Sequence, residues 1–285
     1  MEAKPTMRSI GRVRARDGTG LYCEVLDRGC DRWLVLVHGI GEHCGRGDGL
    51  LSVLGERHNL LRYDLRGHGR SEGRRGYVGN FAEHFCDLED VVRHAFCLYP
   101  NLRYDVFGHS MGALVVAGML QGGAGRVSLP RRVFLASPPV GIGGFGGSLV
   151  NRIPQYVFRA LCRLPVSLPL SSAFNRSFLS HDAGVVERLD RDPLSLKRLH
   201  SKLALGLVAA SKDVFSRPLA VPVELFGAVG SADRIVSPAA AKRYFREFES
   251  RADFRVFEGA YHELHHEVAR YREPYFDFLR YVFGS

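Results

Sequence analysis

The sequence lacks any apolar run long enough to cross a membrane. A spanning helix needs about 20 consecutive apolar residues, and no stretch of the chain approaches that length. The segment 1–18 carries four arginines but no apolar region of the kind that secretory signal peptides contain. We therefore expect neither a transmembrane anchor nor a secretory signal in this sequence.

Closely spaced cysteine pairs are also missing. None of the six cysteines belongs to a C-x-x-C motif, and they are scattered through the first part of the chain as Cys23, Cys30, Cys44, Cys86, Cys97 and Cys162. In a chain of 285 residues this pattern favours reduced thiols over a disulfide framework. It indicates a cytoplasmic protein, with peripheral association with a membrane as a further possibility.

The chain has no basic block with interleaved aromatic residues, although its formal net charge is +9. Proteins that bind nucleic acids concentrate such residues on one element, so we expect no nucleic-acid partner. The spread of arginines along the chain is typical of a solvated basic surface. The alternative is attraction to anionic membrane surfaces. The sequence does not indicate an oligomeric state.

Strands and helices alternate along most of the chain, which predicts an α/β fold with a mostly parallel central sheet flanked by helices. Short apolar runs predict buried strands at 33–38, 60–64, 104–108, 133–136, 223–227 and 254–257. Apolar residues at steps of three and four predict helices at 81–99, 110–121, 238–248 and 263–282.

The alternation stops between the fourth and fifth predicted strands. Residues 143–217 contain helical patterns but no convincing strand. We expect a helical cap, or lid, inserted into an α/β core made of residues 1–142 and 218–285. Within the cap, 150–164 predicts an amphipathic helix with a stripe of Arg152, Arg159 and Arg163. Such a helix either packs on the protein or lies in an anionic membrane interface.

The motif Gly108-His109-Ser110-Met111-Gly112 follows a predicted buried strand and opens a predicted helix. This context is that of a nucleophile elbow, in which a tight turn presents a serine at the carboxyl edge of the sheet. Glycines at the flanking positions remove side chains that would clash with the neighbouring strand and helix. We expect Ser110 to be the nucleophile.

A serine hydroxyl needs an adjacent base that an acid holds in place. In this fold the acid and the histidine follow the serine in that order, each after a later strand. Asp233 follows the fifth predicted strand and His262 follows the sixth. We therefore expect Ser110, Asp233 and His262 to form a catalytic triad.

A reaction through an oxyanion also needs two hydrogen-bond donors. The first expected donor is the backbone N–H of Met111, directly after the nucleophile. The second lies in the loop after the first predicted strand, where Gly39 and Gly41 let the backbone approach a substrate. Ile40 is the residue expected to supply it, and His38 is expected to orient the loop.

Five motifs together resemble the monoacylglycerol lipase and lysophospholipase group of α/β-hydrolases: HGIGEHCGR, YDLRGHGRSEG, GHSMG, GSADRIVSP and EGAYHELHHE. The resemblance runs from about Trp33 to about Pro274. It implies a serine esterase that acts on single-chain lipids, with a cap that forms an acyl tunnel. It also implies that Glu42, Arg46 and His265 bind the glycerol end of the substrate.

Two other motifs match known sites less well. His262-Glu263-Leu264-His265-His266 spells the zinc signature H-E-x-x-H, but too little chain follows for a third ligand. Residues 141–146 spell G-x-G-x-x-G, but no acidic residue stands about 20 positions later, as a dinucleotide site requires. These glycines are more typical of a hinge into the cap. We expect no metal and no organic cofactor.

The sequence therefore predicts a serine hydrolase that cleaves esters of single-chain lipids, foremost monoacylglycerols, through an acyl-enzyme. A lysophospholipase, a thioesterase and a short-chain carboxylesterase would use the same triad and remain alternatives. A catalytically idle hydrolase fold that only binds ligands is the alternative from outside the enzymes.

Overall fold

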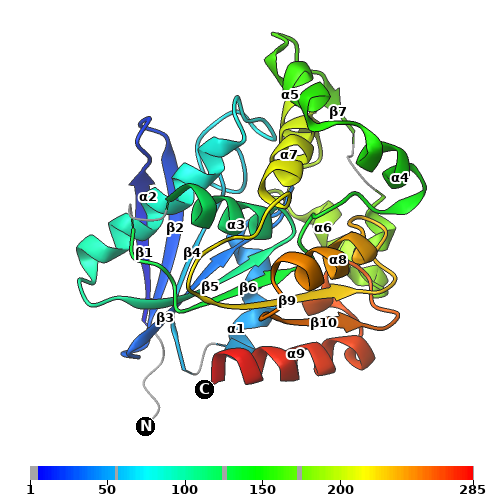
Figure 1. Cartoon of the computed structure of the whole chain (residues 1–285). Helices are drawn as coiled ribbons and strands as arrows, with labels where there is room; N and C mark the ends of the chain where they lie inside the picture. The colour runs from blue at the N-terminus through cyan, green and yellow to red at the C-terminus, as the bar shows by residue number, and fades with distance from the viewer. Residues whose placement is uncertain (1–5, 55–56, 124–126, 172–174, 285) are drawn as a thin grey trace.

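The computed structural model describes residues 6–54, 57–123, 127–171 and 175–284. Within them, eight strands form one sheet in the order β1-β2-β4-β3-β5-β6-β9-β10 (Figure 1). β1 pairs antiparallel with β2, and β2 with β4, whereas the remaining neighbours run parallel. The strands are β1 (Thr6–Arg14), β2 (Gly20–Asp27), β3 (Arg32–Val37), β4 (Asn59–Tyr63), β5 (Arg103–His109), β6 (Arg132–Ala136), β9 (Glu224–Gly230) and β10 (Asp253–Phe257).

Helices cover both faces of the sheet, as a mostly parallel sheet requires. One face is buried beneath α2 (Ala82–Leu98), α3 (Met111–Gly123) and α8 (Pro238–Phe248). The other is buried beneath α1 (Asp48–Leu54) and α9 (Ala269–Gly284). The central strands are therefore apolar on both faces, and Leu34 and Val35 of β3 are fully buried.

The six predicted strands correspond to β3, β4, β5, β6, β9 and β10. The sixth was predicted to be buried, but β10 is an edge strand and is only partly buried. The prediction missed β1 and β2, which form an antiparallel hairpin at one edge of the sheet. Arginines alternate with other residues in β1, and its register shifts between Ser9 and Gly11. An edge strand of this kind lacks the continuous apolar run that marks a strand buried on both faces.

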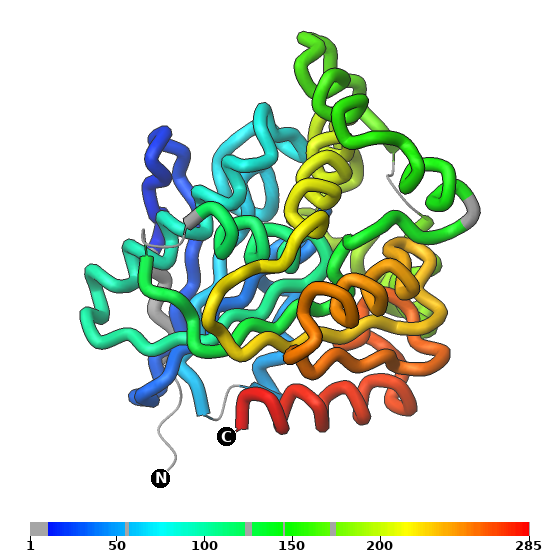
Figure 2. Tube along the Cα trace, viewed as in Figure 1, coloured from blue at the N-terminus to red at the C-terminus, as the bar shows by residue number. Residues whose placement is uncertain are grey.

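Between β6 and β9 the chain leaves the sheet and builds helices over its edge, seen in green and yellow in Figure 2. Two two-residue strands also pair there, which the sequence did not predict. The elements are α4 (Gly144–Arg152), α5 (Gln155–Arg163), β7 (Pro169–Leu170), η2 (Arg176–Phe178), α6 (Ala183–Arg191), β8 (Leu199–His200) and α7 (Ser201–Val214).

The single helix predicted over 150–164 is wrong. The chain leaves helical geometry at Ile153, with ψ of 127°, and resumes it after Pro154, the N-cap of α5. A proline removes a backbone N–H and disfavours helical geometry in the residue before it. Two shorter helices therefore replace one, and the three arginines of the stripe are divided between them.

No helix among the described residues combines the length and the apolarity that crossing a bilayer demands. All six cysteines lie in described segments, and each is a free thiol.

Candidate active site

Ser110 lies in the tight turn between β5 and α3. Its φ is 53°, a left-handed conformation that residues other than glycine rarely adopt. The backbone N–H of Ser110 donates to the Ala136 carbonyl at the end of β6, 2.9 Å away, which holds the turn against the sheet. Strain of this kind persists only where the surrounding structure enforces it, and it is concentrated at functional sites.

The flanking glycines are a steric requirement of this turn. A Cβ atom at Gly108 would lie 2.6 Å from the Gly112 carbonyl oxygen, and one at Gly112 would lie 2.2 Å from the Val37 carbonyl oxygen. Both distances are far shorter than ordinary contacts of a Cβ atom. The two glycines thus let α3 start directly against β3 and β5.

His262 and Asp233 reach Ser110 from the ends of two other strands. The Ser110 hydroxyl lies 2.9 Å from Nε2 of His262, and Nδ1 of His262 lies 2.7 Å from Oδ2 of Asp233. The other oxygen of Asp233 accepts the backbone N–H groups of Ile235 and Val236 at 2.8 and 3.0 Å. The carboxylate is therefore fixed, and it holds the imidazole with Nε2 toward the serine.

His262 is buried, with 2% of its surface exposed. Burial alone lowers the pKa of an imidazole, but Asp233, Glu263 and Glu42 raise it, and the pKa of His262 ends above its usual value. The Ser137 hydroxyl donates to the His262 carbonyl at 2.8 Å and steadies the loop. Ser137 has a φ of 46°, and no local motif marked it in the sequence.

The two residues predicted to supply the oxyanion donors, Met111 and Ile40, both belong to segments next to Ser110. Met111 is the first residue of α3, and the first N–H groups of a helix have no partner within the helix. Ile40 lines the cavities next to Ser110, in a loop that Gly41 turns with a φ of 79°. A Cβ at Gly39 would lie 3.3 Å from Cβ of Ser110, so this loop approaches the serine closely. The oxyanion role of both N–H groups stays a prediction.

His38 connects this loop to the next strand end. Its Nε2 accepts the backbone N–H of Leu65 at 3.0 Å, and its Nδ1 lies 2.8 Å from the Gly39 carbonyl. Both ring nitrogens thus form hydrogen bonds with backbone groups. This is the geometry expected of a side chain that orients the loop.

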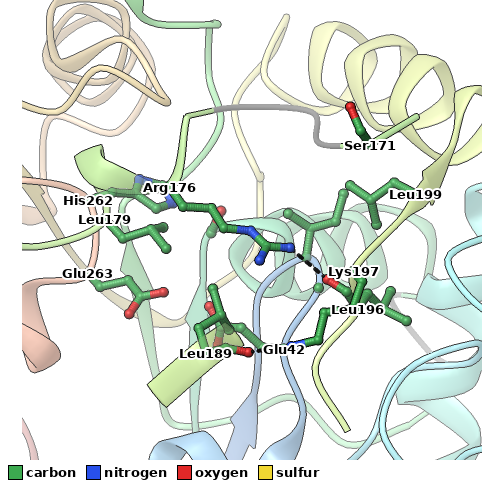
Figure 3. Close-up of a pocket in the computed structure, with 13 residues that line it drawn as sticks. Glu42, Ser171, Arg176, Leu179, Leu189, Leu196, Lys197, Leu199, His262 and Glu263 are labelled. Atoms are coloured by element: carbon green, nitrogen blue, oxygen red, sulfur yellow. Dashed lines mark hydrogen bonds between the residues drawn. The ribbon is translucent and has the colours of Figure 1, made fainter. Parts of the chain in front are cut away.

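Two cavities meet at Ser110. An apolar cavity of about 370 Å³ extends toward α4 and α7, and its lining includes Ile142, Val150, Phe178, Ala204, Leu207 and Val208. A smaller cavity of about 30 Å³ lies on the His262 side beneath η2 and α6 (Figure 3). Its lining includes the carboxylates Glu42 and Glu263 and the cations Arg176 and Lys197. The small cavity also has several leucines in its lining, among them Leu179 and Leu189. The serine hydroxyl therefore stands between an apolar cavity and a smaller one in which charged and apolar side chains are mixed.

The three residues that the resemblance assigned to the glycerol end lie at different depths. Glu42 lines the small cavity next to Ser110. Arg46 lies behind it, with its Nη2 2.6 Å from Glu263 and 3.3 Å from His266. His265 packs edge-on against His109, with ring centres 4.9 Å apart. Neither Arg46 nor His265 is part of the cavity lining, so their substrate contacts stay a prediction.

The loop after His262 differs from the predicted helix over 263–282. A short 3-10 turn, η3 (Leu264–His266), comes first, and α9 begins only at Ala269. The buried carboxylate of Glu267 accepts the backbone N–H groups of Tyr261, Val268 and His181 within 3.1 Å. The loop thus folds around Glu267, and this contact also links the chain between η2 and α6 to the loop that carries His262.

The residues of the H-E-x-x-H match have different partners instead of facing one common point. His262 faces Asp233, whereas Nδ1 of His266 lies 2.7 Å from Glu263. Among the described residues, no three histidine, cysteine, aspartate or glutamate side chains are grouped as ligands for a metal ion.

Comparison with known proteins places these features in a family context. The sequence profile of a family described as "Serine aminopeptidase, S33" matches residues 30–269. The monoglyceride lipase of Homo sapiens is 31% identical over 267 residues, which cover 88% of this chain and 82% of that protein. An uncharacterized abhydrolase domain-containing protein of Dictyostelium discoideum is 25% identical over 256 residues, and the match spans 25% of its length.

A solved structure has the same fold. A soluble variant of the monoglyceride lipase from Saccharomyces cerevisiae, in complex with a substrate analog, superposes with a TM-score of 0.81. The match covers 99% of this chain and 95% of that chain, at 17% sequence identity. This similarity supports the α/β-hydrolase fold predicted from the alternation of strands and helices.

The elbow generates a stability prediction. We expect Gly112→Ala to lower the free energy of unfolding by about 3 kcal/mol, because its Cβ would overlap the Val37 carbonyl. The control is Gly122→Ala on the same helix, where nothing lies within 4 Å of the new Cβ. That change should be neutral or stabilise by up to about 1 kcal/mol. Urea unfolding followed by circular dichroism measures both, and equal effects would contradict the steric account.

Proposed function

This chain belongs to the serine aminopeptidase S33 family. It is an α/β-hydrolase similar to monoglyceride lipases, and therefore a carboxylic-ester hydrolase. On that premise we propose that it cleaves monoacylglycerols through Ser110, His262 and Asp233. The observation that carries the proposal is the continuous contact from Ser110 through His262 to Asp233, at 2.9 and 2.7 Å, beside an apolar cavity of about 370 Å³. A volume of this size is typical of pockets for small molecules.

The proposed reaction has two steps. His262 accepts the proton of Ser110 as the hydroxyl attacks the ester carbonyl, and the N–H groups of Ile40 and Met111 stabilise the oxyanion. His262 then donates the proton to the departing alcohol. Water attacks the acyl-enzyme, with His262 again as the base, and releases a fatty acid.

The two cavities suggest where each part of the substrate binds. The apolar cavity suits the acyl chain, because its lining is mostly aliphatic and aromatic. The small cavity suits the alcohol, because it contains the carboxylate of Glu42, which can accept hydrogen bonds from hydroxyl groups. Residues 143–217 then act as the cap that encloses the acyl chain.

The nucleophile is tested by labelling with a fluorophosphonate probe. We expect the wild-type chain to be labelled with or without EDTA, and Ser110→Ala to lose the label and at least about 10⁴-fold of kcat. Activity that chelation abolishes, without any label, would support the zinc alternative instead. A wild-type chain with neither label nor turnover would support the idle binding protein.

The acyl site is tested by filling the apolar cavity from α7. We expect Ala204→Phe to lower kcat/KM for a decanoyl ester by about tenfold or more, while an acetyl ester changes by less than about threefold. The control is Ala210→Phe on the same helix, which lines a different groove beside Phe85. Equal losses on both esters would argue against this assignment. Monoacylglycerols, lysophospholipids and thioesters, compared at one chain length, rank the alternatives.

We also propose that the outer part of the cap contacts anionic membranes. Large apolar side chains are exposed there, at fractions of 51 to 72%, on Leu149, Tyr156, Leu164, Val166 and Leu168. We call these five residues the cap-tip patch. Arg152 and Arg163 are exposed at the ends of the adjacent helices, while Arg159 pairs with Asp213 at 2.9 Å. Exposed apolar residues flanked by arginines suit an anionic lipid surface.

Vesicle sedimentation tests this contact. We expect Tyr156→Ser with Leu164→Ser to weaken binding to phosphatidylserine-containing vesicles several-fold, and charge reversal of Arg152, Arg159 and Arg163 to weaken it further. Turnover of a soluble ester should persist in both. Tyr281→Ser is the control, since Tyr281 is 62% exposed on α9. Unchanged sedimentation of the cap variants would reject the contact.

A further inference from the structure

Glu263 is a buried carboxylate directly after the catalytic histidine, and the proposed reaction gives it no task. Its residue is 1% exposed, and it lines the small cavity that Ser110 and His262 share (Figure 3). An ionised carboxylate is costly to bury unless other groups pair with it. Its partners therefore indicate what it does.

Two side chains form hydrogen bonds with the carboxylate of Glu263. Nη2 of Arg46 lies 2.6 Å from Oε2 of Glu263, and Nδ1 of His266 lies 2.7 Å from the same oxygen. His266 closes the group, since its Nε2 lies 3.0 Å from the Arg46 carbonyl. Burial raises the pKa of Glu263, but Arg46 and His266 lower it by more than burial raises it. The pKa of Glu263 therefore lies below its usual value, and the carboxyl group stays charged near neutral pH.

Several charged or titratable groups besides Glu263 surround His262. The titratable or charged groups around His262, from every element packed against it, are Asp233, Glu42, Glu263, Arg46, His109, Arg176 and Lys197. Arg176 pairs with Asp190 and donates to the Leu196 carbonyl. Lys197 donates to the carbonyls of Leu189 and Asp190. Both cations are therefore bound within the cap. Next to His262 itself, negative charges outnumber positive ones.

We propose that Glu263 is a positioning residue of this enzyme, whose carboxylate holds Arg46 in place behind the small cavity and stabilises the protonated form of His262. The inference rests on the proposed function, because it presupposes that His262 is the base. Arg46 and Glu263 then act on His262 with opposite signs. Removal of the carboxylate also leaves the Arg46 charge uncompensated, which further disfavours a second positive charge nearby.

The pH dependence of kcat/KM tests this sign. The acidic limb of kcat/KM reports the base of the free enzyme, measured with p-nitrophenyl butyrate on the full chain. We expect Glu263→Gln to move this limb to lower pH by about half a unit or more, because a neutral neighbour makes the imidazole easier to deprotonate. Arg46→Gln should move the limb to higher pH. The double variant should return close to the wild type.

The control is Glu267→Gln. Glu267 is as buried as Glu263, at 1% exposed, but its hydrogen bonds go to His181 and to backbone N–H groups around the loop. This variant should lower the melting temperature while moving the limb much less. The double variant of Glu263→Gln and Arg46→Gln controls for misfolding, because it removes both charges and leaves neither of them buried without its partner.

The outcomes separate two kinds of failure. An unmoved limb in folded Glu263→Gln, or a shift of the same sign in Arg46→Gln, overturns the role of Glu263 while Ser110→Ala remains inactive. Turnover that survives in Ser110→Ala overturns the proposed function itself, whatever Glu263→Gln does.

Discussion

The left-handed backbone at Ser110 is the constraint around which the site is built. A residue with a side chain occupies this conformation at a cost of about 1–3 kcal/mol, and here two flanking glycines and a hydrogen bond to β6 keep it in place. The turn raises the hydroxyl above the carboxyl edge of the sheet. It also starts α3 at once, so the helix N-terminus points to the place where negative charge would develop.

The other parts of the site reach this hydroxyl because parallel strands end at the same edge. Asp233 follows β9 and His262 follows β10, and both loops are short and held by hydrogen bonds between side chains and the backbone. The helical segment between β6 and β9 contacts the loop after β10. Backbone N–H groups of His262 and Glu263 donate to carbonyls of Phe178 and Leu179, and Glu267 binds the chain at His181. These hydrogen bonds connect the segment 176–183 directly to the loop that carries His262.

Buried carboxylates are concentrated around the small cavity next to Ser110 and His262. Glu42, Glu263 and Asp233 are all nearly inaccessible to solvent, and each is paired or hydrogen-bonded. Such groups do not stabilise a fold efficiently, because desolvation offsets much of the attraction. Their placement around one imidazole is easier to understand as control of its charge than as a contribution to stability.

The sequence by itself determined the elements with strong local signals. The runs of β3 to β6, β9 and β10 and the glycines around Ser110 could be recognised, because each depends on neighbours in the chain. Asp233 and His262 could be recognised because each directly follows one of these strands, in the order that the fold requires. Only the tertiary structure decided the rest. The edge hairpin of β1 and β2 is defined by its partner β4, and the loop around Glu267 is defined by contacts with the cap. Arg46 and Glu263 lie far apart in the sequence, so their ion pair, which determines what each side chain can do, exists only once the chain has folded.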